Sequence, residues 1–151
     1  MALTRRTAFT RLAAAASASL VAWRADAAQP AAVGTVPNVV YHLADVDKVG
    51  FVLGNIDNHF KGMGGPDKVH IVLVVHGPAL SAFKTGSANA DLTGRLRAIA
   101  DQGVDLGACG NTLDAQKLDV TQLLPGFVRI DEGGVVRLAK LQAQGYAYIR
   151  S

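Results

Sequence analysis

The sequence predicts a single α/β domain of three layers, in which helices cover both faces of a mostly parallel central sheet of about five strands. Three observations favour this class. Short apolar runs that are typical of strands alternate with segments whose apolar residues recur at helical spacing. Glycine and proline separate many of these segments. With 151 residues, 50% of them hydrophobic, the chain can bury the core of one such domain but not of two.

The predicted strands are short and apolar. Residues 69–75 (VHIVLVV) form a nearly continuous, β-branched run, which is typical of a strand that is covered on both faces. A final edge strand is expected at residues 146–149, after the stop signal at Gly145. In chain order, the predicted strands are residues 39–43, 69–75, 104–108, 127–130 and 146–149.

The predicted helices fall between these strands. In the first, Val49, Val52 and Ile56 share one face, and Asp45 or Asp47 is expected to cap it. In chain order, the predicted helices are residues 49–60, 87–102, 113–124 and 135–142. Strands that alternate with helices in this way favour βαβ units, and therefore a parallel sheet.

The first 27 residues have the three zones of an export signal. Residues 4–7 (TRRT) are positive, and residues 12–22 are uncharged and weakly apolar. Residues 25–27 (ADA) place small side chains where signal peptidase cuts, so the mature chain is expected to start at Ala28, in the periplasm. The apolar zone is too short for a permanent membrane anchor. The alternative is an alanine-rich helix at the start of a cytosolic protein.

The paired Arg5 and Arg6 resemble the twin-arginine (Tat) signal. That pattern usually has a large apolar residue at the position of Ala8, whereas here Phe9 follows one place late. The mild Ala/Ser-rich apolar zone also favours this route, whose passengers cross the membrane folded. Residues 28–38 are expected to form a flexible tether that leads into a domain of residues 39–151.

Charge and composition exclude several classes of function. The net charge of +3 comes from the leader, which holds four arginines and one aspartate, so the remainder is formally neutral. With 6% aromatic residues and no charge run, the chain is not expected to bind nucleic acid. The single cysteine, Cys109, excludes an internal disulfide framework and any multi-cysteine metal site within one chain. No cofactor and no metal are predicted.

Two chemically active residues follow predicted strands. His76 comes directly after residues 69–75, and Cys109 comes directly after residues 104–108. In parallel α/β sheets, sites form beyond the carboxyl ends of the strands, so both side chains face one crevice if these strands are neighbours. The glycines beside Cys109 allow a tight turn that would expose the sulfur. A following helix N-terminus and a His76 imidazolium would favour the thiolate. Cys109 and His76 are therefore the predicted catalytic residues.

Each candidate also has a structural interpretation. Cys109 could be a buried small hydrophobe, which is the common fate of a lone cysteine, and His76 could be a turn residue. Asn111 and Thr112 are predicted to contact substrate, although capping the next helix is the better-supported role for both. His42 ends the first predicted strand and is expected to border the same crevice as a binding residue.

The four histidines leave open a metal site. His59 and His70 have no partner at metal-ligand spacing along the chain. A third and weaker hypothesis is that His42, His76 and Cys109 converge on a metal ion in three dimensions.

Three segments together resemble the DsrE/DsrF-like (DsrEFH, TusD-like) family of sulfur-relay proteins. They are residues 74–83 (VVHGPALSAF), residues 103–113 with Cys109-Gly110-Asn111-Thr112, and residues 141–149 (LQAQGYAYI). The resemblance covers the chain from about Val39 onwards, and the leader would place it in an exported, Tat-signal subgroup.

This resemblance implies a five-stranded, largely parallel sheet and a homo- or hetero-oligomer, often a trimer or hexamer. In the sulfur-relay members a cysteine accepts persulfide sulfur and passes it to a partner protein, and Cys109 is similar in position to that cysteine. His76 is similar to a recurrent histidine of the VVHGPAL subgroup. The well-understood members work in the cytoplasm, towards sulfite production or tRNA thiolation, and the leader argues against tRNA thiolation here.

The expected function is therefore that of a periplasmic sulfur carrier, or of a sulfurtransferase-like protein, with a persulfide on Cys109 and a sulfur donor or acceptor protein as partner. The alternative is a non-catalytic oligomeric module that binds a small ligand or assists assembly, in which Cys109 is structural. Whether the protein is an enzyme stays open between the two.

Overall fold

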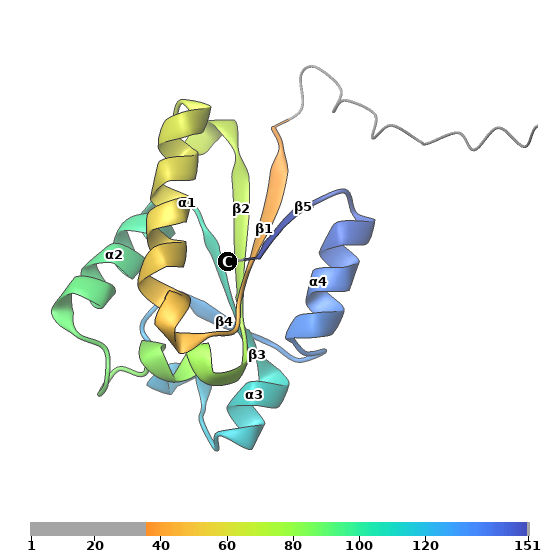
Figure 1. The fold of residues 1–151 in the computed structure, drawn as a ribbon. Helices are drawn as coiled ribbons and strands as arrows, with labels where there is room; N and C mark the ends of the chain where they lie inside the picture. Colours follow the sequence, from red (N-terminus) through yellow and green to blue (C-terminus); the bar gives the residue numbers. More distant parts are fainter. Residues whose placement is uncertain (1–35, 151) are drawn as a thin grey trace, which may run out of the picture. The chain divides into compact units, whose positions relative to one another are not determined.

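The structure, a computed structural model, describes residues 36–150 (Figure 1). The predicted leader, its cleavage point and most of the predicted tether lie outside these residues. None of the helices in residues 36–150 has the length and apolar character needed to cross a membrane.

Strands and helices alternate along the described residues, as the sequence predicts. The elements are β1 (Asn38–Leu43), α1 (Val49–Met63), β2 (His70–Val75), α2 (Ala90–Asp101), β3 (Asp105–Cys109), α3 (Gly110–Ala115), β4 (Phe127–Ile130), α4 (Gly134–Ala143) and β5 (Ala147–Arg150). β1 begins one residue before the expected domain boundary at Val39. A 3₁₀ helix at Gly77–Phe83, with Pro78 near its start, was not predicted.

The strands form one sheet in the order β4-β3-β2-β1-β5, and every neighbouring pair is parallel. This topology confirms the predicted fold class. It also makes β2 and β3 neighbours, with Val75 opposite Ala108. The first and the last strands pair as well, since Val40 lies opposite Tyr148.

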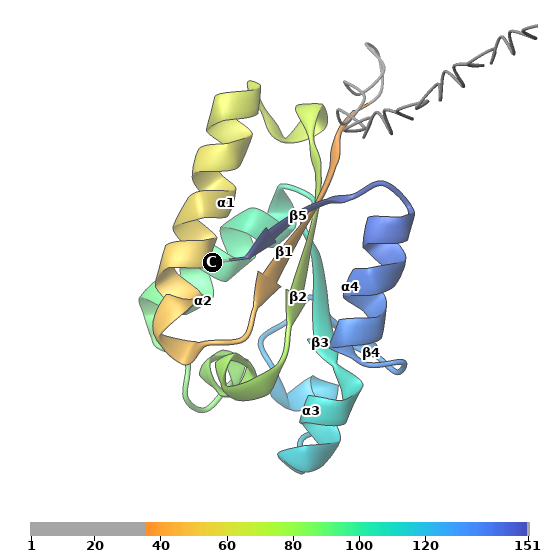
Figure 2. The ribbon, with the colours of Figure 1, turned by 45° about the vertical axis from the view of Figure 1, so that its right-hand side comes forward.

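Helices cover both faces of the sheet, as Figure 2 shows: α1 and α2 lie on one side and α4 lies on the other. Alternating residues of β1 divide between the two layers, because side chains of a strand point to opposite faces. Tyr41 belongs to the larger core under α1 and α2, whereas Val40 belongs to the smaller core under α4. Leu138 and Leu141 supply the contribution of α4 to that smaller core.

The predicted helix at residues 113–124 is wrong in both position and length. α3 begins at Gly110, directly after the cysteine, and ends at Ala115. Lys117 then adopts a left-handed conformation, with φ of 54°, and ends the helical path. The chain continues into a short 3₁₀ helix at Val120–Gln122, where the Asp119 side chain accepts a hydrogen bond from the Thr121 N–H. The apolar residues that suggested one helix reach the core from separate turns.

The other helices differ from expectation at their ends. α2 starts at Ala90 rather than at residue 87, because the side chain of Asn89 accepts a hydrogen bond from the Leu92 N–H at 2.8 Å and caps it there. Neither predicted aspartate caps α1. Asp45 precedes a 3₁₀ turn at Val46–Lys48 and makes no capping hydrogen bond through its side chain, and Lys48 occupies the cap position of α1.

Candidate functional site

The structure brings Cys109 and His76 together at the carboxyl edge of the sheet. β2 and β3 are parallel and run in register, so the residues at and just beyond their ends are neighbours. Gly134, the first residue of α4, lies against both. A β-carbon placed on Gly134 would lie 3.3 Å from the β-carbon of Cys109 and 3.4 Å from that of His76. The two residues, which were predicted to face one crevice, therefore both lie beside the first residue of α4.

The sulfur of Cys109 is buried, contrary to the expectation that flanking glycines would expose it. The residue is 5% exposed. Its Sγ accepts a hydrogen bond from the Gly134 N–H at 3.1 Å. The cysteine occupies the cap position of α3, and Gly134 opens α4, so two helices begin beside one sulfur.

Hydrogen bonds lower the pKa of the Cys109 thiol even though the residue is buried. Burial raises this pKa, because it removes the thiolate from water. The Thr112 hydroxyl and the backbone N–H groups of Gly134, Thr112 and Asn111 lower it by donating to the charged form, and their combined effect prevails. The net result is a thiol that ionises more readily than an ordinary cysteine.

Thr112 and Asn111 support the site instead of capping α3, so the better-supported role expected for them is wrong. The Thr112 Oγ1 accepts a hydrogen bond from the Gly77 N–H at 3.0 Å, which fastens α3 to the segment after His76. The Nδ2 of Asn111 lies only 2.6 Å from where a β-carbon on Gly133 would be, so this amide fills the space beside that glycine. Gly133 has φ of 88°, a conformation that favours glycine.

His42 lies at the same edge and contacts His76 directly. The Nε2 atoms of the two rings are hydrogen-bonded. The ring centroids are 4.6 Å apart and the ring planes differ by 16°, so the two rings are nearly parallel. The Nδ1 of His42 is hydrogen-bonded to the hydroxyl of Tyr148 at 2.6 Å. His42 therefore lies beside His76, and its observed partners are side chains of this chain. Its role as a binding residue that borders a crevice stays a prediction.

Sequence reasoning missed Tyr148. The residue belongs to a segment that was predicted as an edge strand, but nothing in the sequence assigns that strand to the side of β1. Only the pairing of β5 with β1 carries the phenol to His42.

The pKa values of both histidines of this pair are lowered, which favours their neutral forms at neutral pH. For His76, burial is the main cause, the positive charge of Arg150 adds to it, and Asp45 opposes it. For His42, burial again comes first, followed by the charges of His76 and Arg150, and again Asp45 opposes. The neutral form of His76 is therefore favoured over the expected imidazolium. The hydrogen bonds described above, and not a charged His76, lower the pKa of Cys109.

The remaining histidines have partners of their own. His59 is hydrogen-bonded to the Tyr41 hydroxyl at 2.9 Å. His70 joins the carboxylate of Asp105, at 2.9 Å, to the hydroxyl of Tyr146, at 3.1 Å. Within residues 36–150, no three or more His, Cys, Asp or Glu side chains are arranged to hold a metal ion.

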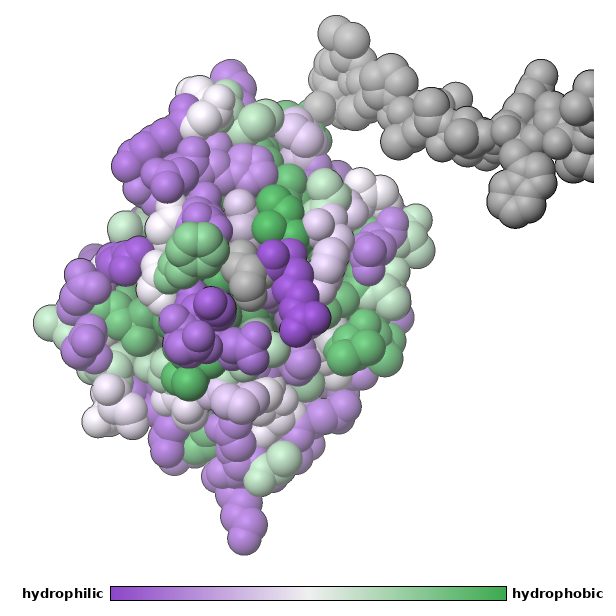
Figure 3. All heavy atoms as spheres, in the orientation of Figure 1, coloured by the Kyte–Doolittle hydropathy of each residue, from purple (hydrophilic) through white to green (hydrophobic). Residues whose placement is uncertain are grey.

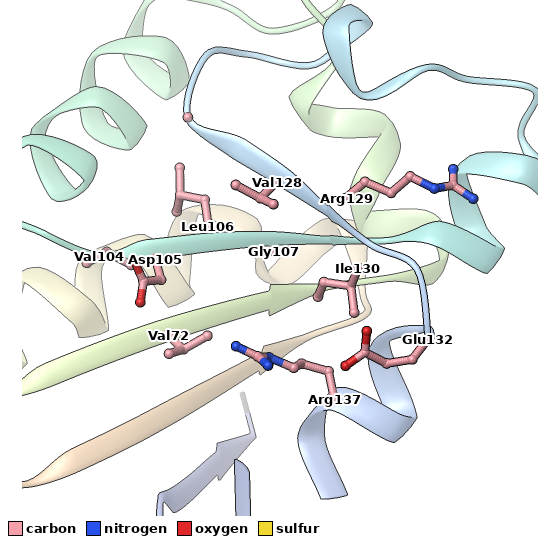
Figure 4. A pocket seen from close by; sticks show the side chains of 11 residues that line it. Val72, Val104, Asp105, Leu106, Gly107, Val128, Arg129, Ile130, Glu132 and Arg137 are labelled. Carbon is pink, nitrogen blue, oxygen red and sulfur yellow. The ribbon is translucent and has the colours of Figure 1, made fainter. Parts of the chain in front are cut away.

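A groove of about 370 Å³ lies over β3 and β4, on the face that α4 covers only in part. Figure 4 shows Val72 and Val128 among the side chains that line it and Arg137 extending from α4 toward Val72. The groove is bounded by Ile130, which is opposite Cys109 in the sheet register. Neither Cys109 nor His76 lines it. The groove thus lies along the β4 side of the sheet and is separate from the cysteine.

Comparison with known proteins gives both a family and a fold. A sequence model of the DsrE/DsrF-like family matches residues 12–150. Among solved structures, the chain is similar to MTH1491, a protein of unknown function from Methanobacterium thermoautotrophicum, with 28% identity and a TM-score of 0.67 over 76% of this chain and 99% of that one.

Two further structures share the fold at lower identity. The ychN protein from E. coli has 14% identity and a TM-score of 0.55, over 78% of this chain and all of its own. BT1422, a conserved protein of unknown function from Bacteroides thetaiotaomicron, has 11% identity and a TM-score of 0.57, over 76% of this chain and 94% of its own. No curated protein matches the chain.

Proposed function

Because this chain belongs to the DsrE/DsrF-like family, we propose that it is a periplasmic sulfur carrier, or a sulfurtransferase-like protein, that holds sulfur as a persulfide on Cys109. The observation that carries the proposal is the hydrogen bond from the Gly134 N–H to the Cys109 sulfur at the carboxyl edge of the sheet. A purely structural cysteine needs no donors aimed at its sulfur. A nucleophilic one gains from them, because they stabilise the thiolate.

The transfer step follows from ordinary thiol chemistry. The Cys109 thiolate attacks the outer sulfur of a donor persulfide, R–S–SH, and a new sulfur–sulfur bond forms. The sulfur–sulfur bond of the donor breaks, and its electron pair leaves with R–S⁻, which takes up a proton. Cys109 then carries –S–SH, and an acceptor thiolate removes the outer sulfur in the same manner. No external oxidant or reductant is consumed.

The buried state of the sulfur sets a condition on this proposal. With Cys109 only 5% exposed, a donor reaches it only when part of the cover moves. The first turn of α4 is the segment we propose to move, since Gly134 contacts the cysteine directly and Gly133 precedes it without a side chain.

The test is sulfur uptake by the mature protein, followed by intact-mass measurement. After incubation with polysulfide, we expect a gain of one sulfur atom per chain, which reducing agent removes. Cys109→Ser should abolish the gain. A matched control restores a cysteine to that variant at Ser87, which is exposed.

The comparison between the two cysteine positions decides the outcome. If the thiol at position 87 takes up sulfur at the wild-type rate, the site around Cys109 contributes nothing. If Cys109 resists both polysulfide and alkylation in the folded protein, the sulfur-carrier function is wrong.

The burial of the cysteine favours one second candidate, a non-catalytic module that binds a small ligand or assists assembly. In that case Cys109 is packing, and the 370 Å³ groove, which Cys109 does not line, is the functional feature. Cys109→Ala would then leave folding and self-association unchanged, and wild-type protein would take up no sulfur.

A further inference from the structure

A row of hydrogen-bonded side chains runs along the carboxyl edge of the sheet, from Tyr148 through His42 to His76. The Tyr148 hydroxyl is bonded to the Nδ1 of His42, and the Nε2 of His42 is bonded to the Nε2 of His76. The row starts at a partly exposed phenol, since Tyr148 is 39% exposed. It ends at the histidine that, with Cys109, flanks Gly134.

The hydrogen bonds of the row can be donated in either of two directions. A hydrogen bond between two imidazole nitrogens holds a single proton, so one ring donates it and the other accepts it. When Tyr148 donates to His42, His42 donates to His76, and the proton of the neutral His76 ring is then on Nδ1. In the reverse pattern, His76 donates to His42, and His42 donates to the phenol oxygen. Interconversion of the two patterns moves one proton from end to end.

The surroundings keep both rings neutral, which this exchange requires. Burial lowers the pKa of both, and the positive charge of Arg150 acts in the same direction. Asp45 is the opposing charge. A proton can thus pass along the row in a concerted manner without a stable imidazolium.

The row does not touch the sulfur. In the described part of the chain, no hydrogen bond links the His76 ring to the Cys109 Sγ, which accepts from the Gly134 N–H and from the donors of α3 described above. Because His76 and Cys109 both lie against Gly134, His76 can act on a group that enters beside the cysteine, which in the proposed transfer step is the leaving sulfur of the donor.

We infer that Tyr148, His42 and His76 form a proton path that protonates the leaving thiolate when Cys109 takes sulfur from a donor. The inference rests on the proposed function. The leaving R–S⁻ takes the proton from His76 Nδ1, and His76 Nε2 takes the proton that His42 Nε2 held. His42 Nδ1 takes the proton of Tyr148, and water restores it to the phenol. The net step moves one proton from solvent to the leaving thiol.

The experiment compares two reagents that react with Cys109 and whose leaving groups differ in basicity. An alkyl persulfide releases a basic thiolate that needs a proton, whereas an aromatic disulfide releases a stable thiolate that does not. Tyr148→Phe should slow transfer from the alkyl persulfide by about 10-fold or more and leave the reaction with the aromatic disulfide within about 2-fold of wild type. His42→Gln should have the same selective effect.

Tyr146→Phe is the matched control, because it removes a phenol that bonds to His70 in the separate row with Asp105. This variant should react like wild type with both reagents. The wild-type reaction with the alkyl persulfide should also be slower in heavy water, and Tyr148→Phe should reduce that solvent isotope effect.

The outcomes separate the path from the function. If Tyr148→Phe slows both reagents equally, or neither, while wild type still takes up sulfur, the proton path is wrong and the sulfur carrier stands. If wild-type Cys109 takes up no sulfur, the carrier function fails and the path fails with it.

Discussion

Two opposed influences act on the sulfur of Cys109. Burial disfavours its charge, and a set of N–H and O–H donors from two helices favours it. The hydroxyl of Thr112 is one of these donors, and its oxygen is already occupied as an acceptor by the Gly77 N–H at 3.0 Å. That contact leaves the hydroxyl proton free to point at the sulfur. A single threonine therefore links the reactivity of the cysteine to the segment after His76.

Thr112→Val should raise the pKa of the Cys109 thiol, because the side chain keeps its shape and loses its donor. We expect alkylation by iodoacetamide at pH 7 to slow by about 5-fold, since one such hydrogen bond contributes ~1 kcal/mol. Thr112→Ser keeps the hydroxyl and should react like wild type. Equal rates in the valine and serine variants would show that the hydroxyl has no part in the ionisation.

The His42–His76 pair should make the folded protein less stable in acid. The folded-state pKa of both rings is below the value of 6.5 of a free histidine, so the unfolded chain binds protons more readily over that interval. The pair's contribution is complete above about pH 6.5 and is lost as the pH falls towards the folded-state values. Urea unfolding from pH 8 to pH 5 should show this loss. The double variant His42→Gln/His76→Gln should show a smaller dependence on pH, and an unchanged dependence would contradict the assignment.

At the scale of the elements, the start of α4 depends on two glycines. Gly133 has a positive φ and lies against the side chain of Asn111, and Gly134 approaches the cysteine closely. The helix can therefore reach the sheet edge only where side chains are absent. Its first N–H then reaches the sulfur.

Gly133→Ala should destabilise the protein by about 1–3 kcal/mol, because it forces a β-carbon into a left-handed backbone and against Asn111. Gly94→Ala is the control: this glycine lies in α2 with open space around it, and alanine there should stabilise the helix by about 0.5–1 kcal/mol. Urea unfolding measures both. A Gly133→Ala variant as stable as wild type would show that the turn can adapt.

The sequence predicted the strands and most helices because their signals are local. The run at residues 69–75 and the spacing of Val52 and Ile56 depend only on near neighbours. The helix predicted at residues 113–124 failed for the opposite reason. There, Leu118 and Leu123 reach the core by way of turns, and a left-handed residue between α3 and the next 3₁₀ helix has no distinctive sequence signal.

The site was predictable in part. Cys109 and His76 could be placed at strand ends, and the strand order supplied their proximity. The parts that Gly134 and Tyr148 play in the site could not be predicted. They depend on how α4 and β5, which come last in the described sequence, pack against the sheet. The burial of the sulfur was also beyond local reasoning, since it depends on the packing of α4.

At the scale of the whole chain, exposed apolar side chains on the surface favour association between copies of the protein. Figure 3 shows hydrophilic and hydrophobic residues mixed over the face in view. Several large apolar side chains of the described residues are exposed, among them Val128 and Val135, which are near the groove and the start of α4. We propose on this basis, and from the family, that the protein is a homo-oligomer, a trimer or a hexamer. Light scattering on the mature chain tests this, and a monomer at all concentrations would contradict it.

Export is the second property of the whole chain that can be tested. We expect full-length protein made in a bacterium to be recovered from the periplasm with Ala28 as its first residue, as shown by N-terminal sequencing. Replacing Arg5 and Arg6 by lysine should retain the precursor in the cytoplasm if the Tat route is used. Normal processing of the lysine variant would indicate a different route.

The pairing of β1 with β5 orders events during synthesis. Asn38–Leu43 emerges from the ribosome before any other strand of the sheet, and Ala147–Arg150 emerges after all of them. One side of the earliest strand therefore stays without its hydrogen-bonding neighbour until the latest strand has been translated, so the sheet cannot be complete before that segment has emerged. The same late segment delivers the phenol of Tyr148, which means that a nascent chain cannot possess the finished proton row before it possesses the finished sheet.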